Sequence, residues 1–434
     1  MNLTIDKLIY GGNGLARLGA DDNGPGKVVF LPFVLEGERV EAEVTEQKPG
    51  FARARANKIL EPSPHRIASA CPYFGQCGGC HYQHTSYEHQ LRIKSAILRE
   101  TLCRVGKIEL AQGIHVHAAQ PWNYRNRTRL RVRTRPFVLG YNRLRWRELL
   151  PVEQCPISSP LINRAIAALW DLGRTDSVSG DVAEIELFTN AEDTKLLAEL
   201  TVQEEGCWRG RKSDLAQFVI ALRTAVPEVT GVVLLHAVGR GEVELEEIPA
   251  ELREIFGADY LLYTTGNVSF QVSAGSFFQI NRFLIDKLVE LVSAGRSGGY
   301  ALDVYAGTGL FSVALAKEFR EVGAVESCPF TFRNLMRNCP ENVRLYQQSM
   351  EEFIVEAKPD LVVVDPPRAG LGQSVAELLA TSGTPRITCV SCDPATLARD
   401  LTVLTQSGYR IEEVHLVDMF PQTLHIESVI QLVR

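Results

Sequence analysis

The chain has 434 residues, of which 45% are hydrophobic and 23% charged, and its formal net charge is −6. This composition is typical of a soluble globular protein, and the length predicts about three domains. The mild negative charge argues weakly against a nucleic-acid partner, although the local distribution of charge matters more than its sum. The first residues lack the pattern of a signal peptide, and no apolar run approaches the ~18 residues of a membrane span. We therefore expect a cytoplasmic protein without membrane contact.

Residues 1–62 are predicted to form a small β-domain. Short strands at 28–34, 38–44 and 52–56 are separated by turns rich in Gly, Asn and Pro. About five short strands favour a Greek-key barrel of the OB type, a fold often used to bind nucleic acid. Another kind of small β-domain is the alternative, and the Pro-rich stretch at 61–65 indicates a linker.

Three cysteines then occur within ten residues, at Cys71, Cys77 and Cys80. In a cytoplasmic protein, closely spaced thiols indicate metal or cluster ligands more than disulfides. Cys155 lies in another loop flanked by proline and is a candidate fourth ligand. Four thiolates hold either a zinc ion or an iron–sulfur cluster, and the spacing alone leaves both open.

A helix is predicted at 86–105 with Ser86 as its cap, and an arginine-rich segment follows it. Arginine occupies every second position from 125 to 135, which places all six side chains on one face of a strand. A turn expected at 140–142 leads to three more arginines by residue 147. The interleaved aromatic residues are Trp122, Tyr124, Phe137, Tyr141 and Trp146. We interpret this segment as an RNA-binding hairpin with stacking groups. The alternative is a strand face paired with the acidic residues at 181–205.

From about residue 263 the pattern becomes α/β, after a mixed segment without readable motifs. A buried strand at 300–305, a Gly-rich turn at 306–309, a helix from 310 and a strand at 322–326 predict a nucleotide-binding βαβ unit. Glu326 ends the second strand, where an acid can hold ribose hydroxyls. Ser312 stands where a dinucleotide fingerprint has its third glycine. This disfavours NAD and favours S-adenosylmethionine, which has no pyrophosphate.

Two further strands end in residues that suggest chemistry. Asp365 follows a buried strand and precedes two prolines, which make its loop rigid. Cys392 lies just before Asp393-Pro394, a predicted helix start whose partial positive charge favours a thiolate, although Asp393 opposes that effect. An inert buried cysteine and a redox or metal pair with Cys389 are the alternatives. Parallel strands of a doubly wound sheet end at one cleft. The residues expected there are Tyr305, Glu326, Asp365 and Cys392.

Three C-terminal motifs resemble those of the RNA uracil-5-methyltransferase family. They are Asp-Pro-Pro-Arg-Ala-Gly at 365–370, Ser-Cys-Asp-Pro-Ala-Thr-Leu-Ala-Arg-Asp at 391–400 and Pro-Gln-Thr-Leu-His-Ile-Glu at 421–427. The Ser-Phe-Phe-Gln-Ile-Asn segment at 276–281 is similar to the family's cofactor-binding segment. The resemblance implies an OB-like TRAM barrel at 1–62, a central α+β domain with an iron–sulfur loop at 63–262, and a Rossmann-like S-adenosylmethionine methyltransferase domain at 263–434.

The resemblance also implies roles for individual residues. Cys392 is the expected nucleophile and Glu427 the expected base, although the strand pattern alone would make Glu427 a solvent-facing residue. The expected cofactor-site residues are Gln279, Tyr305, Glu326 and Asp365. The expected ligands of a [4Fe–4S] cluster are Cys71, Cys77, Cys80 and Cys155. The helix at 86–105 is expected to pack on the catalytic domain.

The expected reaction is formation of 5-methyluridine in RNA by a monomeric enzyme. The cluster ligands favour 23S ribosomal RNA as the substrate, and the T-loop uridine of tRNA is the alternative. An amino-group N-methyltransferase, which would not need Cys392, and a non-enzymatic RNA-binding protein, which should not bind S-adenosylmethionine, are the rival functions.

Overall fold

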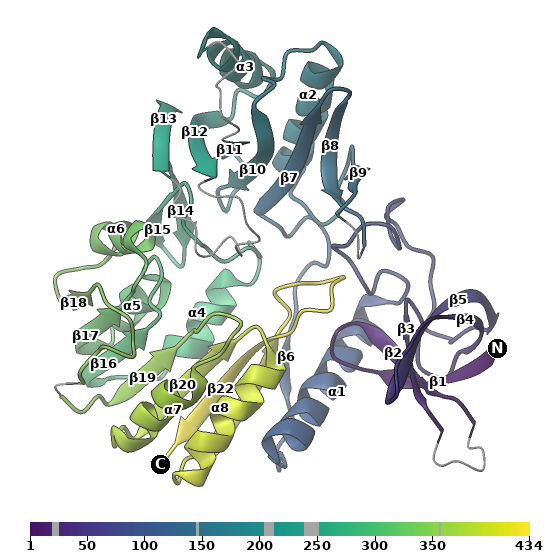
Figure 1. Cartoon of the computed structure of the whole chain (residues 1–434). Helices are drawn as coiled ribbons and strands as arrows, with labels where there is room; N and C mark the ends of the chain where they lie inside the picture. The colour runs from purple at the N-terminus through teal and green to yellow at the C-terminus, as the bar shows by residue number, and fades with distance from the viewer. Residues whose placement is uncertain (20–25, 145–146, 204–211, 238–250, 356) are drawn as a thin grey trace.

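The computed structural model describes the chain except residues 20–25, 145–146, 204–211, 238–250 and 356. Three sheets organise it: a barrel near the N-terminus, a central sheet, and a larger sheet that contains the C-terminus (Figure 1). Among the described residues, no helix is long and apolar enough to cross a membrane.

The N-terminal segment forms a closed five-stranded barrel in the order β1-β2-β3-β5-β4. The strands are β1 (Asn2–Leu8), β2 (Asn13–Arg17), β3 (Val28–Pro32), β4 (Arg39–Gln47) and β5 (Phe51–Glu61). Buried and exposed residues alternate along β1 and the first half of β4, as expected for strands with one face in a core. The interior is filled by small and branched apolar side chains such as Ile5, Val29 and Leu31. The predicted barrel is confirmed.

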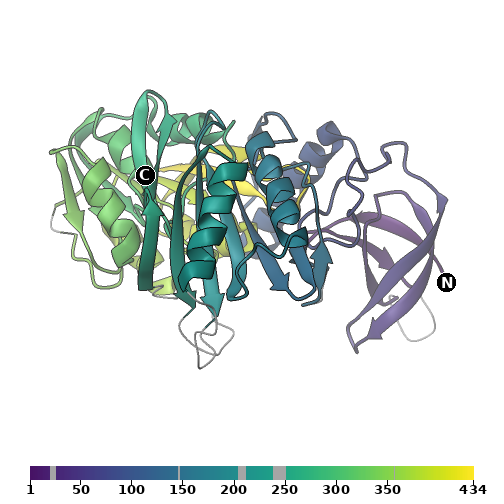
Figure 2. The same cartoon turned by 90° about the horizontal axis from the view of Figure 1, so that it is seen from above.

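The central sheet has seven strands in the order β13-β12-β11-β10-β7-β8-β9. They are β7 (Arg127–Thr134), β8 (Phe137–Asn142), β9 (Leu149–Pro151), β10 (Val182–Thr189), β11 (Leu196–Gln203), β12 (Val229–Ala237) and β13 (Glu251–Gly257). Helices α2 (Pro160–Arg174) and α3 (Lys212–Ala225) cover one face of this sheet (Figures 1 and 2). Only the opposite face is therefore available to the arginines of β7.

The third sheet has eight strands in the order β18-β17-β16-β19-β20-β22-β21-β6. They are β6 (His115–His117), β16 (Gly298–Val304), β17 (Phe319–Val325), β18 (Val343–Tyr346), β19 (Leu361–Val364), β20 (Arg386–Ser391), β21 (Arg410–Val417) and β22 (Glu427–Val433). The strands β18 to β20 run parallel, whereas β22 is antiparallel to both of its neighbours. A separate β-hairpin, β14 (Tyr260–Thr265) and β15 (Val268–Ser273), lies between β13 and β16 in the chain.

Helices cover both faces of the eight-stranded sheet, which makes it a doubly wound α/β fold. Helices α4 (Ile285–Ser293), α5 (Leu310–Leu315) and α6 (Pro329–Asn338) contribute to one core. Helices α1 (Tyr87–Gly106), α7 (Gly372–Thr381) and α8 (Pro394–Gln406) contribute to the other. The side chain of Ser86 caps α1, as predicted, and α1 lies beside α8 (Figure 1). The expected packing of this early helix on the catalytic part of the chain is confirmed.

The turn predicted at residues 140–142 is wrong, because β8 continues through Gly140 and the hairpin turns at Arg135-Pro136. The glycine has another purpose. A Cβ atom on Gly140 would lie 1.9 Å from the carbonyl oxygen of Leu150 in the neighbouring strand β9. Glycine is therefore required here by the close approach of two strands, and the sequence signal was mistaken for a turn.

Ser312, the residue at the missing third glycine, has a structural role of its own. Its hydroxyl donates a hydrogen bond of 2.5 Å to the buried carboxylate of Asp303 in β16. The strand and the following helix α5 are thus joined by a polar contact beneath the Gly-rich turn.

Candidate active site and cysteine cavity

The sheet register brings the ends of its parallel strands to one edge. Val304 of β16 pairs with Val325 of β17 and with Val364 of β19. The residues that follow these three strands are Tyr305, Glu326 and Asp365. The predicted convergence of strand-end residues is therefore built into the backbone pairing.

Cys392 and Glu427 are brought together by the antiparallel pair β20–β22. Ser391 pairs with Ser428, and the Ser428 hydroxyl donates to the Ser391 carbonyl at 3.2 Å. Cys392 is the next residue after this pair on one strand, and Glu427 is the preceding residue on the other. Glu427 is only 4% exposed, so the strand pattern alone, which made it a solvent-facing residue, was misleading.

Helix α8 begins immediately after Cys392. The carboxylate of Asp393 accepts hydrogen bonds from the backbone N–H groups of Ala395 and Thr396, and Pro394 occupies the first turn, as predicted. Cys389 is buried within β20 and pairs with Ile430. It belongs to the core beneath the site.

Burial and charge set the protonation of this site. Burial, followed by the nearby carboxylates of Glu427 and Asp365, raises the pKa of Cys392 to about 12, and Arg368 opposes this effect. Burial thus opposes the stabilisation of a thiolate that is expected from the helix start. Burial also raises the pKa of Asp365 to about 7 and holds that of Glu427 well above its usual range. In each case burial favours the neutral form of the group, which is the thiol for Cys392 and the carboxylic acid for Asp365 and Glu427.

Tyr305 and Glu326 flank the Gly-rich turn. Tyr305 has a left-handed backbone with φ of 64°, which is unusual for a residue with a large side chain. Glu326 accepts hydrogen bonds from the backbone N–H groups of Gly307, at 2.9 Å, and Cys328, at 2.7 Å. Its carboxylate is thus oriented at the turn by two backbone donors.

Gln279 is held through its backbone by the segment that leads into β7. The side-chain amide of Asn126 donates to the Gln279 carbonyl at 3.0 Å, and the Asn126 N–H donates to the Ile280 carbonyl at the same distance. Asn281 then donates to the Met419 carbonyl at 3.1 Å. The segment around Gln279 therefore borders the loop that leads to Glu427.

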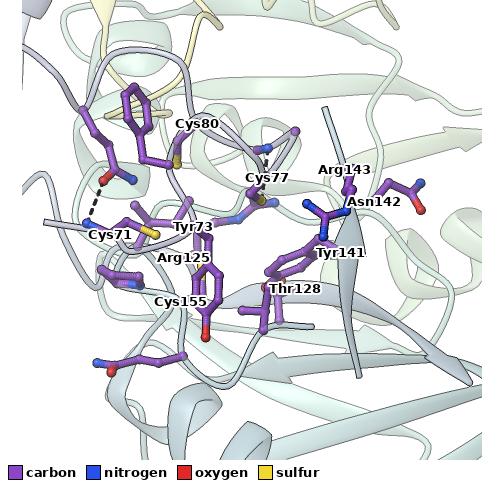
Figure 3. A pocket seen from close by; sticks show the side chains of 18 residues that line it. Cys71, Tyr73, Cys77, Cys80, Arg125, Thr128, Tyr141, Asn142, Arg143 and Cys155 are labelled. Carbon is purple, nitrogen blue, oxygen red and sulfur yellow. Dashed lines mark hydrogen bonds between the residues drawn. The ribbon is translucent and has the colours of Figure 1, made fainter. Parts of the chain in front are cut away.

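The four predicted cluster ligands line one cavity of about 270 Å³ (Figure 3). Cys71, Cys77 and Cys80 come from the Gly-rich loop, and Cys155 comes from the loop after β9. Burial raises the pKa of Cys77 to about 11 and that of Cys80 to about 12. Across the described residues, no group of three or more His, Cys, Asp or Glu side chains is arranged to hold a metal ion.

Two other side chains in this cavity interact with the cysteine thiols. The hydroxyl of Tyr141, in β8, lies 2.7 Å from the Thr128 hydroxyl and also interacts with Cys155. Arg125 lines the same cavity, and its charge lowers the pKa of Cys77. The cavity thus combines four thiols with a hydroxyl and a cation.

The arginine face of β7 is only partly available to a ligand. Arg129 is ion-paired with Glu186 at 2.7 Å, and Arg127 lies 3.1 Å from Glu186 and 3.6 Å from Glu199. The register explains this, because β10 places Glu186 opposite Arg129. For the first half of β7, the alternative of a strand face paired with the acidic residues at 181–205 is therefore confirmed. Arg131 and Arg133 form no ion pair within the described part of the chain.

Most of the interleaved aromatic residues are also structural. Tyr124 is fully buried and donates to the Pro421 carbonyl at 3.0 Å. Phe137 packs edge-on against Trp170 of α2. Tyr141 belongs to the cysteine cavity, and Trp146 lies outside the described residues. The interpretation of these rings as an RNA-stacking surface is therefore corrected for Tyr124, Phe137 and Tyr141.

Three residues near the site were not predicted. The charge of Arg368 lowers the pKa of both Cys392 and Glu427. Its position directly after Asp-Pro-Pro could have indicated from the sequence that it lies near the site. Tyr10, in the barrel, donates to Asp393 at 2.7 Å. Gln90, in α1, forms hydrogen bonds with Gln422. The last two contacts join residues more than 300 positions apart, so no local pattern could have indicated them.

The doubly wound sheet with its strand-end site and the attached barrel define a Rossmann-like α/β protein with an additional small β-domain. The family model described as tRNA (Uracil-5-)-methyltransferase matches residues 86–360 and 354–434, and the TRAM domain model matches residues 1–56. The chain belongs to the family of RNA (uracil-5-)-methyltransferases, enzymes that methylate C5 of uracil with S-adenosylmethionine.

Full-length relatives support this assignment. The chain is 32% identical over 441 residues to an uncharacterised RNA methyltransferase of Aquifex aeolicus, covering 99% of this chain and 97% of the relative. It is 31% identical to the 23S rRNA (uracil(1939)-C(5))-methyltransferase RlmD of Shewanella denitrificans, covering 99% and 94%. The solved structure of Pyrococcus abyssi tRNA (uracil-54, C5)-methyltransferase with S-adenosyl-L-homocysteine is 25% identical, with a TM-score of 0.77 over the whole of both chains.

Proposed function

We propose that the enzyme methylates a uridine of 23S ribosomal RNA through a covalent bond between Cys392 and C6 of the uracil. The observation that carries the proposal is the register of β20 and β22, which places Cys392 beside Glu427. A nucleophile next to a buried carboxyl group is the pair that this chemistry needs.

The steps follow from the chemistry of uracil. C5 is a poor nucleophile until a thiolate adds to C6, which makes C5 enolate-like. Bound S-adenosylmethionine would then supply the methyl group: the C5–CH3 bond would form as the S–CH3 bond breaks, and S-adenosylhomocysteine would leave. Glu427 then removes the C5 proton, the C5–C6 double bond reforms, and the Cys392 thiolate leaves. Asp365, which lies near both groups, is proposed to hold the uracil edge. The cofactor is proposed to contact Gln279, Tyr305 and Glu326.

The target base must leave its stack, because C6 is not accessible within a stacked strand. The barrel and the far end of the arginine face, Arg131 and Arg133, are proposed to hold the surrounding RNA. Phosphate contacts would offset the cost of flipping, which is a few kcal/mol.

A covalent adduct tests the mechanism. RNA with 5-fluorouridine has no C5 proton to lose, so it should trap the enzyme in a complex that survives denaturation and requires S-adenosylmethionine. The Cys392→Ser variant should give no complex. Adduct formation by that variant would exclude Cys392 as the nucleophile.

The choice of ribosomal RNA is supported by the 31% identical relative named for 23S rRNA. The tRNA substrate named for the 25% identical structure is the second candidate. The purified enzyme should be offered unmodified 23S rRNA fragments and a T-loop tRNA in parallel. Methylation of the tRNA alone would overturn the proposed substrate.

We further propose that the cysteine cavity holds a [4Fe–4S] cluster through Cys71, Cys77, Cys80 and Cys155. The proposal is supported by the four thiols lining one cavity, since four thiolates are the ligand set of such a cluster. Such a cluster would hold the cysteine loop in one conformation or would carry electrons. Anaerobically purified protein should be brown, with about four irons per chain. Stoichiometric zinc without colour would refute the cluster.

A further inference from the structure

The loop that leads into Glu427 is held by an extensive set of buried hydrogen bonds. Gln422 lies near its centre, with a left-handed backbone at φ of 70°. The Gln422 N–H donates to the side-chain oxygen of Gln90, and the Gln90 amide donates back to the side-chain oxygen of Gln422, both at 3.0 Å. Both glutamines are buried, at 1% and 2% exposure. This reciprocal pair joins α1 to the loop.

The cysteine loop holds the same residue from the other side. The backbone N–H groups of His81 and Tyr82 both donate to the Gln422 carbonyl, at 2.8 and 3.0 Å. His81 directly follows Cys80, which lines the cysteine cavity. The N–H group, the carbonyl and the side-chain oxygen of Gln422 thus all have partners outside its own loop.

The start of the loop is fixed as firmly. The buried ammonium group of Lys94, one turn after Gln90 on α1, lies 2.6 Å from the Asp418 carboxylate and 2.9 Å from the Phe420 carbonyl. Tyr124 donates to the Pro421 carbonyl at 3.0 Å. A rigid support of this kind keeps a reactive group within the small error that catalysis tolerates.

We propose that Gln90 and the backbone after Cys80 form a clamp on Gln422 that positions Glu427 for removal of the C5 proton. Gln90 is a positioning residue in this proposal, because it acts through the loop and not on the substrate. The inference rests on the proposed function of Cys392 and Glu427 and assigns a role to residues outside the strand-end site.

One step of the reaction depends on the clamp more than the other steps do. Addition of the Cys392 thiolate to C6 and attack of C5 on the methyl group do not use the base. The last step breaks the C5–H and S–C6 bonds: the proton passes to Glu427, its electron pair forms the C5–C6 double bond, and the thiolate leaves. A displaced Glu427 should therefore leave the methylated RNA bound to Cys392.

The test uses the full-length protein and RNA that contains ordinary uridine. Gln90→Met removes the donor and the acceptor that hold Gln422, together with a hydrogen bond to the Thr85 carbonyl. Gln422→Met removes the side-chain amide whose oxygen accepts from Gln90, leaves the backbone of Gln422 unchanged, and serves if the first variant does not fold. With S-adenosylmethionine, each variant should accumulate a denaturation-stable RNA adduct and turn over about tenfold to a hundredfold more slowly. Adduct formation with 5-fluorouridine RNA should proceed at the wild-type rate.

Gln431→Leu is the matched control, since Gln431 is a buried amide at the far end of β22 that donates to the Leu291 carbonyl at 3.0 Å. It should lower the melting temperature without adduct accumulation. Slow turnover of the clamp variants without an adduct on uridine RNA would overturn the inference. If wild-type enzyme forms no adduct with 5-fluorouridine RNA, the proposed function fails and the clamp fails with it.

Discussion

The hydroxyl of Tyr10 donates a hydrogen bond of 2.7 Å to the carboxylate of Asp393, the residue that follows Cys392. Tyr10 belongs to the turn after β1, so the barrel touches the loop of the proposed nucleophile. The same turn approaches the loop before Glu427, because a Cβ atom on Gly12 would lie 3.3 Å from the Leu424 side chain. The barrel is thus in direct contact with the loops that carry the proposed nucleophile and lead to the proposed base.

Removal of this hydrogen bond should slow the reaction of Cys392. The negative charge of Asp393 raises the pKa of the Cys392 thiol, and the hydrogen bond from the Tyr10 hydroxyl partly neutralises that charge. In Tyr10→Phe the pKa of Cys392 should rise further, and each additional unit lowers the thiolate fraction about tenfold. The measurement is the rate of iodoacetamide alkylation of Cys392 as a function of pH. An unchanged profile would show that the barrel contact has no effect on the thiol.

The two cysteines of β20 and its exit should behave differently when replaced by serine. Cys392→Ser should abolish methyl transfer, because a hydroxyl is a much weaker nucleophile toward C6. Cys389→Ser should retain activity and destabilise the protein by about 1–3 kcal/mol, because it buries a hydroxyl in an apolar core. Methyl incorporation and thermal unfolding measure the two effects. An inactive but folded Cys389→Ser protein would contradict its assignment to the core.

Arginines on the two halves of β7 should affect different properties. In Arg131→Gln/Arg133→Gln, RNA affinity should fall, and the dependence of log K on log salt should weaken by about one unit for each phosphate that is no longer neutralised. Arg129→Gln should instead lower stability, because it removes a partner of the mostly buried Glu186. Salt titrations of RNA binding and denaturant unfolding separate the two. Equal salt slopes in the double variant and the wild type would remove Arg131 and Arg133 from the RNA surface.

Asp303 should make stability decrease with rising pH. Burial raises its pKa in the folded protein from 3.8 to about 7. Between these values the folded state binds more protons than the unfolded state, so the free energy of unfolding falls as pH rises, by up to about 4 kcal/mol. Asp303→Asn removes this titration. Urea unfolding at pH 5 and pH 8 should show the variant gaining relative to the wild type at the higher pH, and a constant difference would refute the shift.

The fold was largely readable from the sequence because its signals are local. Turn residues between short strands indicated the barrel, and buried strands followed by a Gly-rich turn or by Asp-Pro-Pro indicated the doubly wound sheet. Ser86 was identified as a helix cap from residue type alone. Gly140 shows the limit of such signals. A side chain at this position would collide with strand β9, which lies beside it only in the folded protein.

The sequence by itself determined which residues end the parallel strands, and chain direction in a doubly wound sheet then brings Tyr305, Glu326 and Asp365 to one edge. Only the tertiary structure decided which charges are compensated. Arginine alternation in β7 is the same whether the partner is RNA or Glu186, and the register with β10 selects Glu186 for Arg129. Likewise, burial of Glu427 and the clamp on Gln422 depend on contacts between segments far apart in the chain, which no periodicity of one segment encodes.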